Sequence, residues 1–122
     1  VFMKVKLKKI FMFDAAHKLP GLKAEHKCAT LHGHTYKVEI LLEGPVEERQ
    51  KWLIDFGEFK RIVQPVIDEL DHTFLNEIPG LENPTAENIC RWLWGKIKPM
   101  LPLLYEIVVW ETDTSACIYN GE

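Results

Sequence analysis

The sequence predicts an α+β fold in which one antiparallel sheet carries both helices on a single face. Runs of alternating apolar and polar residues come in pairs near both ends of the chain, and two segments between them repeat apolar residues every three or four positions. The expected order is β-β-α-α-β-β, a pattern typical of one helical layer on one sheet. The 122 residues, 47% of them hydrophobic, suit one modest core, so we expect a single domain over residues 1–122.

The first two strands are predicted to form a pair. Residues 4–13 place apolar side chains mostly at odd positions and lysines mostly at even ones, which fits a strand with one buried face. The alternation resumes at residues 32–42, and Gly44-Pro45 is expected to end that run. His17 lies just beyond the first run, so it is expected to end the first strand.

Two amphipathic helices are predicted in the middle of the chain. Asp55 can cap a helix whose apolar stripe spans residues 59–70, with Glu58 placed to complete a capping box. Pro65 lies inside this stripe and should kink the helix without ending it. Thr85 can cap a second helix whose apolar face spans residues 86–97.

The last two strands are predicted to complete the sheet. Residues 105–111 alternate around Tyr105, Ile107 and Val109, and a short strand through Ala116, Ile118 and Tyr119 follows a turn. The other sheet face would still carry apolar residues, and both sheet edges would be open. The apolar residues on that face are Ile10, Met12, Val108 and Trp110. We therefore expect a homo-oligomer that covers the face and the edges.

Composition excludes several classes of function. The formal net charge is -3 and lysines are mixed with glutamates throughout, which gives no strongly basic face, so nucleic acid is not an expected partner. Lysines at positions 4, 6, 8 and 9 interrupt the apolar N-terminal run, which argues against a signal peptide or a membrane span. Three widely spaced cysteines are a poor basis for a disulfide framework. We expect a cytoplasmic protein that does not bind membranes.

Three histidines are candidate ligands for one metal ion. His32 and His34 are two residues apart on a predicted strand, so both imidazoles project from the same face. A pair of this kind is weak evidence on its own, because most such histidines are simply packed or solvated. If the first two strands pair, His17 can reach the same ion. Three histidines would leave the fourth position of a tetrahedral zinc ion open, as in catalytic zinc sites.

Cys28 lies four residues before His32, in a predicted loop. Lys27, other nearby lysines and a neighbouring metal ion would all favour its thiolate, so it is a candidate reactive thiol. The alternatives are a metal ligand or a small buried apolar residue. For Cys90 and Cys117, packing in a helix stripe and a strand is the favoured interpretation.

Three further polar residues are candidates for proton transfer or binding. Asp71 could orient His72 for proton transfer, although the end of a helix explains a histidine there equally well. Glu111 continues the apolar parity of its strand, so its carboxylate would point towards the helices or into a pocket. A planar ligand with two parallel N–H donors, such as the aminopyrimidinone edge of a pterin, would satisfy that carboxylate. The alternative is a strand end that reaches solvent.

Several motifs in this order resemble the 6-pyruvoyl-tetrahydropterin synthase family. They are DAAH at residues 14–17, CATLHGH at 28–34, LDH at 70–72, NPTAE at 83–87 and Glu111. The segment IPGLENPT at residues 78–85 and the ending CIYNGE look most like the bacterial branch, the 6-carboxy-tetrahydropterin synthases of queuosine precursor synthesis. The resemblance covers nearly the whole chain, and the set of motifs with these spacings is specific.

The resemblance implies a zinc-dependent carbon–carbon lyase. Such an enzyme converts 7,8-dihydroneopterin triphosphate to 6-carboxy-5,6,7,8-tetrahydropterin and releases acetaldehyde and triphosphate. The zinc ligands of the family match His17, His32 and His34. Its general base matches Cys28, and its proton relay matches His72 with Asp71. Its pterin anchor matches Glu111, and Thr85 is a further pterin contact unless it is only a helix cap.

The resemblance also implies the tunnelling fold, in which several chains join their sheets into a barrel and the active sites lie between chains. A hexamer is expected, with His72 supplied by a neighbouring chain. The nearest rival activity is 6-pyruvoyl-tetrahydropterin synthesis, which retains the substrate side chain. A cupin-like metal oxygenase using Glu39 is a more distant alternative, but parity places Glu39 on the opposite face from the histidines. A non-catalytic pterin-binding module is the third.

Overall fold

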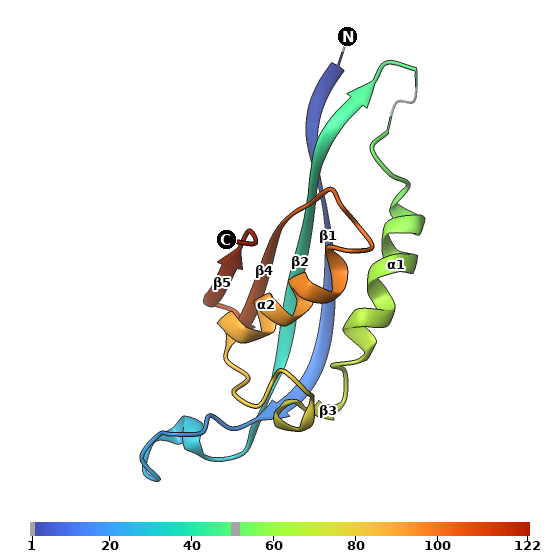
Figure 1. Cartoon of the computed structure of the whole chain (residues 1–122). Helices are drawn as coiled ribbons and strands as arrows, with labels where there is room; N and C mark the ends of the chain where they lie inside the picture. Colours follow the sequence, from blue (N-terminus) through green and yellow to red (C-terminus); the bar gives the residue numbers. More distant parts are fainter. Residues whose placement is uncertain (1, 50–51) are drawn as a thin grey trace.

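The structure is a computed structural model that describes residues 2–49 and 52–122. It contains one five-stranded sheet in the order β3-β1-β2-β4-β5, with two helices packed on it (Figure 1). The strands are β1 (Phe2–His17), β2 (His32–Glu47), β3 (Thr73–Phe74), β4 (Leu104–Thr112) and β5 (Ser115–Tyr119). The helices are α1 (Phe56–Asp68) and α2 (Ala86–Ile97), with short 3-10 turns at η1 (Lys27–Ala29) and η2 (Leu75–Glu77). The predicted α+β class is therefore confirmed, but the sheet is mixed rather than fully antiparallel, because the unpredicted strand β3 lies between the helices in sequence and pairs in parallel with β1.

The β1–β2 hairpin contains the two longest strands of the sheet. The two strands are antiparallel and pair along their whole length, from Phe2 opposite Glu47 to His17 opposite His32. Residues 18–31 join them and extend beyond the end of the sheet, away from both helices (Figure 1). The predicted pairing is thus confirmed, and it brings the two histidine-bearing strand ends together.

The core lies between the sheet and the helices. α1 packs on β1, whereas α2 packs on β4 and β5. On the sheet side, Phe13 stacks on Tyr36 with ring centroids 4.7 Å apart, and both rings are buried. The helices contribute the buried residues Phe59, Val63, Val66, Ile67, Ile89, Cys90, Leu93 and Ile97. The apolar stripes predicted for both helices are the faces that pack on this sheet.

Both predicted helix caps are present. The Asp55 carboxylate accepts a hydrogen bond from the Glu58 backbone N–H at 3.2 Å, and the Thr85 hydroxyl accepts one from Asn88 at the same distance. The reciprocal half of the capping box is absent, because the Glu58 carboxylate pairs with Arg61 instead. α1 continues through Pro65 to Asp68, as predicted.

β2 does not end at Gly44-Pro45 but continues to Glu47. β4 pairs with β2 only as far as Leu42, so Pro45 lies where β2 has only β1 as a ladder partner. Proline is tolerated at such an edge position, since no central ladder needs its missing N–H. The prediction of a strand end at this proline was wrong for that reason.

The parity predicted for β4 fails at one residue. The β2–β4 register shifts after Leu41, which pairs with Glu106, while Leu42 pairs with Leu104. The extra residue, Tyr105, is exposed on the open face, where Lys6 lies 4.4 Å from its ring centroid. A β-bulge shifts the alternation of side chains by one residue, so Leu104 rather than Tyr105 enters the core.

The sheet face away from the helices carries both exposed apolar residues and ion pairs. Ile10, Met12 and Ile118 remain exposed there, at 49%, 59% and 65%. Towards one end of this face, lysines of β1 form ion pairs with Glu39 and Glu43. Glu39 therefore lies on the open face, as its parity predicted, and the cupin alternative is excluded. No helix within the described ranges is long and apolar enough to cross a membrane.

Candidate metal site

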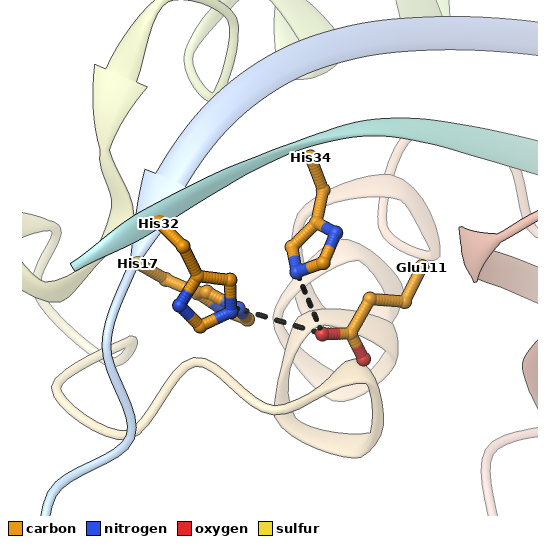
Figure 2. A group of neighbouring side chains, drawn as sticks. All are labelled: His17, His32, His34 and Glu111. Carbon is orange, nitrogen blue, oxygen red and sulfur yellow. Dashed lines mark hydrogen bonds and ion pairs between the residues drawn. The ribbon is translucent and has the colours of Figure 1, made fainter. Parts of the chain in front are cut away.

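Four side chains meet at one end of the sheet, where β1 and β4 end and β2 begins. His17 comes from the end of β1, His32 and His34 from the start of β2, and Glu111 from the end of β4. One ligand atom from each lies within 4.8 Å of all the others. Figure 2 shows the imidazoles of the two paired strands turned towards one point, with the Glu111 carboxylate facing them from the opposite side.

The strand register explains why the histidines converge. His17 and His32 are directly opposite in the antiparallel pair, and His34 follows His32 on the same face of β2. The three rings are nearly perpendicular to one another, with centroids 4.6 to 5.0 Å apart. The convergence of His17, His32 and His34 that the sequence predicted is therefore present in the fold.

Backbone carbonyls fix the outward-facing nitrogen of two of the rings. His17 Nδ1 lies 2.9 Å from the Pro84 carbonyl oxygen, and His32 Nδ1 lies 2.7 Å from that of Thr30. Since a carbonyl oxygen can only accept, each Nδ1 carries a proton and each neutral ring presents an unprotonated Nε2 to the centre. The buried Tyr36 hydroxyl also lies 3.1 Å from His17 Nδ1. Histidine ligands of metal ions are commonly held in this way.

The inward-facing atoms are spaced as metal ligands are. Nε2 of His17 and Nε2 of His32 are 3.1 Å apart, and Glu111 Oε1 lies 3.2 Å from His34 Nε2 and 3.4 Å from His17 Nε2. Ligands at about 2.0–2.1 Å from a tetrahedral zinc ion are separated by about 3.3–3.4 Å. Without a shared cation, the lone pairs of the histidine Nε2 atoms and of the Glu111 carboxylate would face one another. The donor set therefore fits a metal ion.

His34 gives a second indication of a ligand. Its Nε2 is buried and, among the described residues, has no hydrogen-bond partner of acceptable geometry. Burial lowers the pKa of His34 below its ordinary value, and the neighbouring His17 and His32 add to this effect, while Glu111 opposes it. Burial thus favours the neutral imidazole, the form that binds metals.

Glu111 lies between the histidines and a small cavity. This cavity, of about 290 Å³, is lined by Ala86 and Glu87 of α2, Glu111 of β4, and Ser115, Ala116 and Cys117 of β5. The sequence predicted that Glu111 would point into a pocket or towards the helices. The structure also brings its carboxylate to the histidines, where the sequence had left the fourth position open.

Cys28 lies outside the group of metal-ligating atoms. It belongs to η1, in the loop that joins β1 to β2, and is half-buried. Its carbonyl accepts a hydrogen bond from Leu19 at 2.8 Å, and its N–H donates to His26 at 3.1 Å. Both bonds lie within residues 18–31, so they order the loop around Cys28, and its role as a reactive thiol remains a prediction.

Asp71 and His72 form a pair away from the histidine group. Asp71 Oδ2 lies 3.0 Å from His72 Nδ1, and Asp71 Oδ1 accepts a hydrogen bond from the Asp14 backbone at 2.9 Å. The His72 backbone N–H donates to the Asp14 carbonyl. His72 has a positive φ of 58° and its side chain is 79% exposed. α1 ends at Asp68, so the pair lies in the connection to β3, beyond the helix end.

One open cavity lies beside His72. It measures about 540 Å³, and His72 lines it together with Asp14, His34 and Thr35. The part played by Asp14 could not be predicted, because nothing in DAAH indicates that its backbone holds residues 71 and 72. The Pro84 carbonyl was missed for the same reason, since a backbone acceptor leaves no mark in the sequence.

Thr85 serves as a helix cap. Its hydroxyl accepts from Asn88 at the start of α2, next to Ala86 and Glu87, which line the Glu111 cavity. The capping explanation raised by the sequence is therefore confirmed. A contact with a ligand in that cavity remains a prediction.

Three convergent histidines and a carboxylate at one end of an α+β sheet, with a cavity beside the carboxylate, define a candidate metalloenzyme site. The chain belongs to the 6-pyruvoyl tetrahydropterin synthase family, whose model matches residues 6–122.

Named relatives and a solved structure agree with this assignment. The 6-carboxy-5,6,7,8-tetrahydropterin synthase of Synechocystis is 37% identical, with 91% of this chain and 89% of the relative covered. The dihydroneopterin monophosphate aldolase of Pyrococcus furiosus is 39% identical over 81% of this chain and 82% of its own. The 6-pyruvoyl tetrahydropterin synthase structure from Caenorhabditis elegans superimposes with a TM-score of 0.90 at 25% identity, covering 98% and 97% of the two chains.

Proposed function

We propose that this chain is a lyase that converts 7,8-dihydroneopterin triphosphate and one water molecule to 6-carboxy-5,6,7,8-tetrahydropterin, acetaldehyde and triphosphate. The support from comparison is the Synechocystis relative of that name, which matches across most of both chains. The support from geometry is the meeting of three imidazole nitrogens beside a carboxylate. The product is a precursor for queuosine, and the cytoplasm is the expected compartment.

His17, His32 and His34 would hold a zinc ion through their Nε2 atoms. A zinc ion bound there supplies a Lewis acid that polarises the side-chain oxygens of the substrate and acidifies the neighbouring C–H. Residues of the chain itself orient the ligands and transfer the proton. The Pro84 and Thr30 carbonyls keep His17 and His32 in the tautomer that the site requires.

Cys28 is assigned as the general base that takes the proton from the substrate. Its loop adjoins the histidine-bearing strand ends, so the thiol can be brought to the substrate side chain. His72 is assigned as the relay that exchanges this proton, with Asp71 holding its Nδ1 and leaving the exposed Nε2 free to react. In the assembled enzyme, His72 of a neighbouring chain is proposed to serve this site.

Glu111 is assigned as the anchor of the pterin ring. Its carboxylate borders a cavity with small side chains from α2 and β5, and a carboxylate can accept two parallel N–H donors from an aminopyrimidinone edge. Thr85, at the start of α2 beside this cavity, is assigned as a further contact. We propose a homo-oligomer, a hexamer in particular, as the working form.

The single observation that carries the proposal is the four-residue group in a chain of this family. The test is incubation of the zinc-loaded protein with 7,8-dihydroneopterin triphosphate, followed by mass spectrometry of the pterin and trapping of the small carbonyl product. We expect 6-carboxytetrahydropterin and acetaldehyde in equal amounts. Intact substrate after prolonged incubation would argue against the proposal and for a non-catalytic pterin-binding module.

Two neighbouring activities are separated by the same assay. A pyruvoyl pterin without acetaldehyde would identify 6-pyruvoyl-tetrahydropterin synthesis, the activity in the name of the nematode protein. Turnover of dihydroneopterin monophosphate in preference to the triphosphate would identify the activity in the name of the Pyrococcus relative. Both substrates should therefore be supplied in parallel.

A further inference from the structure

The Glu111 carboxylate lies closer to the imidazoles than a residue that only anchors a substrate needs to be. Its Oε1 is 3.2 Å from His34 Nε2 and 3.4 Å from His17 Nε2, while the His17 and His32 nitrogens are 3.1 Å apart. These separations approach the edges of a tetrahedron around one zinc ion, about 3.3–3.4 Å for bonds of 2.0–2.1 Å. Three of the six separations within the group are thus close to this value, and Glu111 takes part in two of them.

An ordinary ion pair does not account for this placement. His17 Nδ1 donates a hydrogen bond to the Pro84 carbonyl, so in the neutral ring Nε2 has only a lone pair to present to the carboxylate. Two acceptors at this distance repel each other unless a cation lies between them.

The Glu111 carboxylate also borders a cavity into which it could turn. Glu111 lines the cavity of about 290 Å³ formed with α2 and β5, and its side chain is 30% exposed, so it is not packed rigidly. A glutamate has enough rotatable bonds to face either the histidines or this cavity. The two placements are alternatives, because a carboxylate turned into the cavity to meet two parallel N–H groups moves its Oε1 away from the histidine nitrogens.

We propose that Glu111 is the fourth ligand of the metal ion in the substrate-free enzyme and that a pterin displaces it. The inference rests on the proposed function for the identity of the metal and of the pterin. In the free enzyme the carboxylate closes the coordination sphere. When the pterin ring enters the cavity, the carboxylate turns to accept its two N–H groups, and the fourth position opens for the substrate side chain.

The test uses the full-length protein loaded with Zn²⁺ or Co²⁺, and it compares wild type, Glu111→Gln and Glu111→Asp. Glu87→Gln is the matched control, because Glu87 lines the same cavity but lies outside the ligand group. Competition with a chelator should show Zn²⁺ affinity lowered by roughly tenfold or more in both Glu111 variants and unchanged in Glu87→Gln. Equal affinity in wild type and both Glu111 variants would overturn the proposal.

A spectroscopic arm tests the displacement itself. The visible absorption of the Co²⁺ protein reports its ligand set, and pterin without a side chain serves as the probe. We expect pterin to change this spectrum in wild type and to leave it unchanged in Glu111→Gln. An unchanged wild-type spectrum at saturating pterin would contradict the exchange. Neither arm requires turnover, so these results stand apart from the fate of the proposed reaction.

Discussion

Cys28 is the residue on which the proposed chemistry depends most directly. It lies outside the four-residue metal group, in a loop whose backbone is held by Leu19 and His26. Cys28→Ala should therefore keep its metal content and its Tm while losing turnover. Cys117→Ala, on β5, is the matched control and should retain the removal of the substrate proton that Cys28 carries out. Metal analysis, thermal unfolding and the product assay on both variants check this, and unchanged turnover in Cys28→Ala would remove the thiol from the mechanism.

Asp71 should make the stability of the fold depend on pH. The hydrogen bond from the Asp14 backbone, followed by the contact with His72, lowers the pKa of Asp71 below its ordinary value of 3.8. A lowered carboxyl pKa stabilises the fold above the unfolded value, and this stabilisation is lost as the pH falls through the folded value. The Tm of wild type should exceed that of Asp71→Asn at pH 6, and the gap should shrink below about pH 3.8. A gap of constant size over that range would contradict the assignment.

At the scale of single residues, the sequence predicted that the candidate ligands converge but not the backbone contacts that orient them. His17, His32 and His34 were found because strand parity and pairing place them on one face. The backbone contacts that orient His17 and His72 come from Pro84 and Asp14, which are distant in the sequence. Such contacts depend on tertiary structure, so no local pattern reveals them.

The start of α2 connects an ordinary structural role with a proposed functional one. Thr85 caps the helix, and removing a threonine cap costs about 1 kcal/mol. Thr85→Ala should lower the free energy of unfolding by about that amount, and Thr85→Asp should restore it, as measured by chemical denaturation. If Thr85 also contacts the pterin, Thr85→Asp should still show a raised KM. A wild-type KM in that stable variant would leave the cap as the sole role.

At the scale of elements, both helices and the four longer strands were predictable from periodicity, while their irregularities were not. The bulge at Tyr105 shifts the alternation of β4, and the two-residue strand β3 is too short to have a pattern. Pro45 looked like a strand end because local sequence does not show which strands lie beside it. In each case the tertiary environment decided the outcome.

The open sheet face leads to a prediction for the whole molecule. Met12 is 59% exposed on this face, opposite Lys37 of β2, and an assembly of chains would bury it. Met12→Lys should reduce the particle mass in light scattering and abolish turnover, yet retain the metal, because the ligands come from one chain. Met100→Lys, at an exposed site after α2, is the control and should keep the wild-type mass. A wild-type mass equal to one chain at micromolar concentration would contradict the assembly.

The central claim is that one metal ion lies among His17, His32 and His34. The direct measurement is metal content by elemental analysis of the purified protein, alongside His34→Gln and the control His26→Gln, whose imidazole lies outside the group. We predict about one zinc ion per chain in wild type and His26→Gln, and a strong loss in His34→Gln. A wild-type protein without stoichiometric metal after zinc loading, or equal metal content in His34→Gln, would contradict the account.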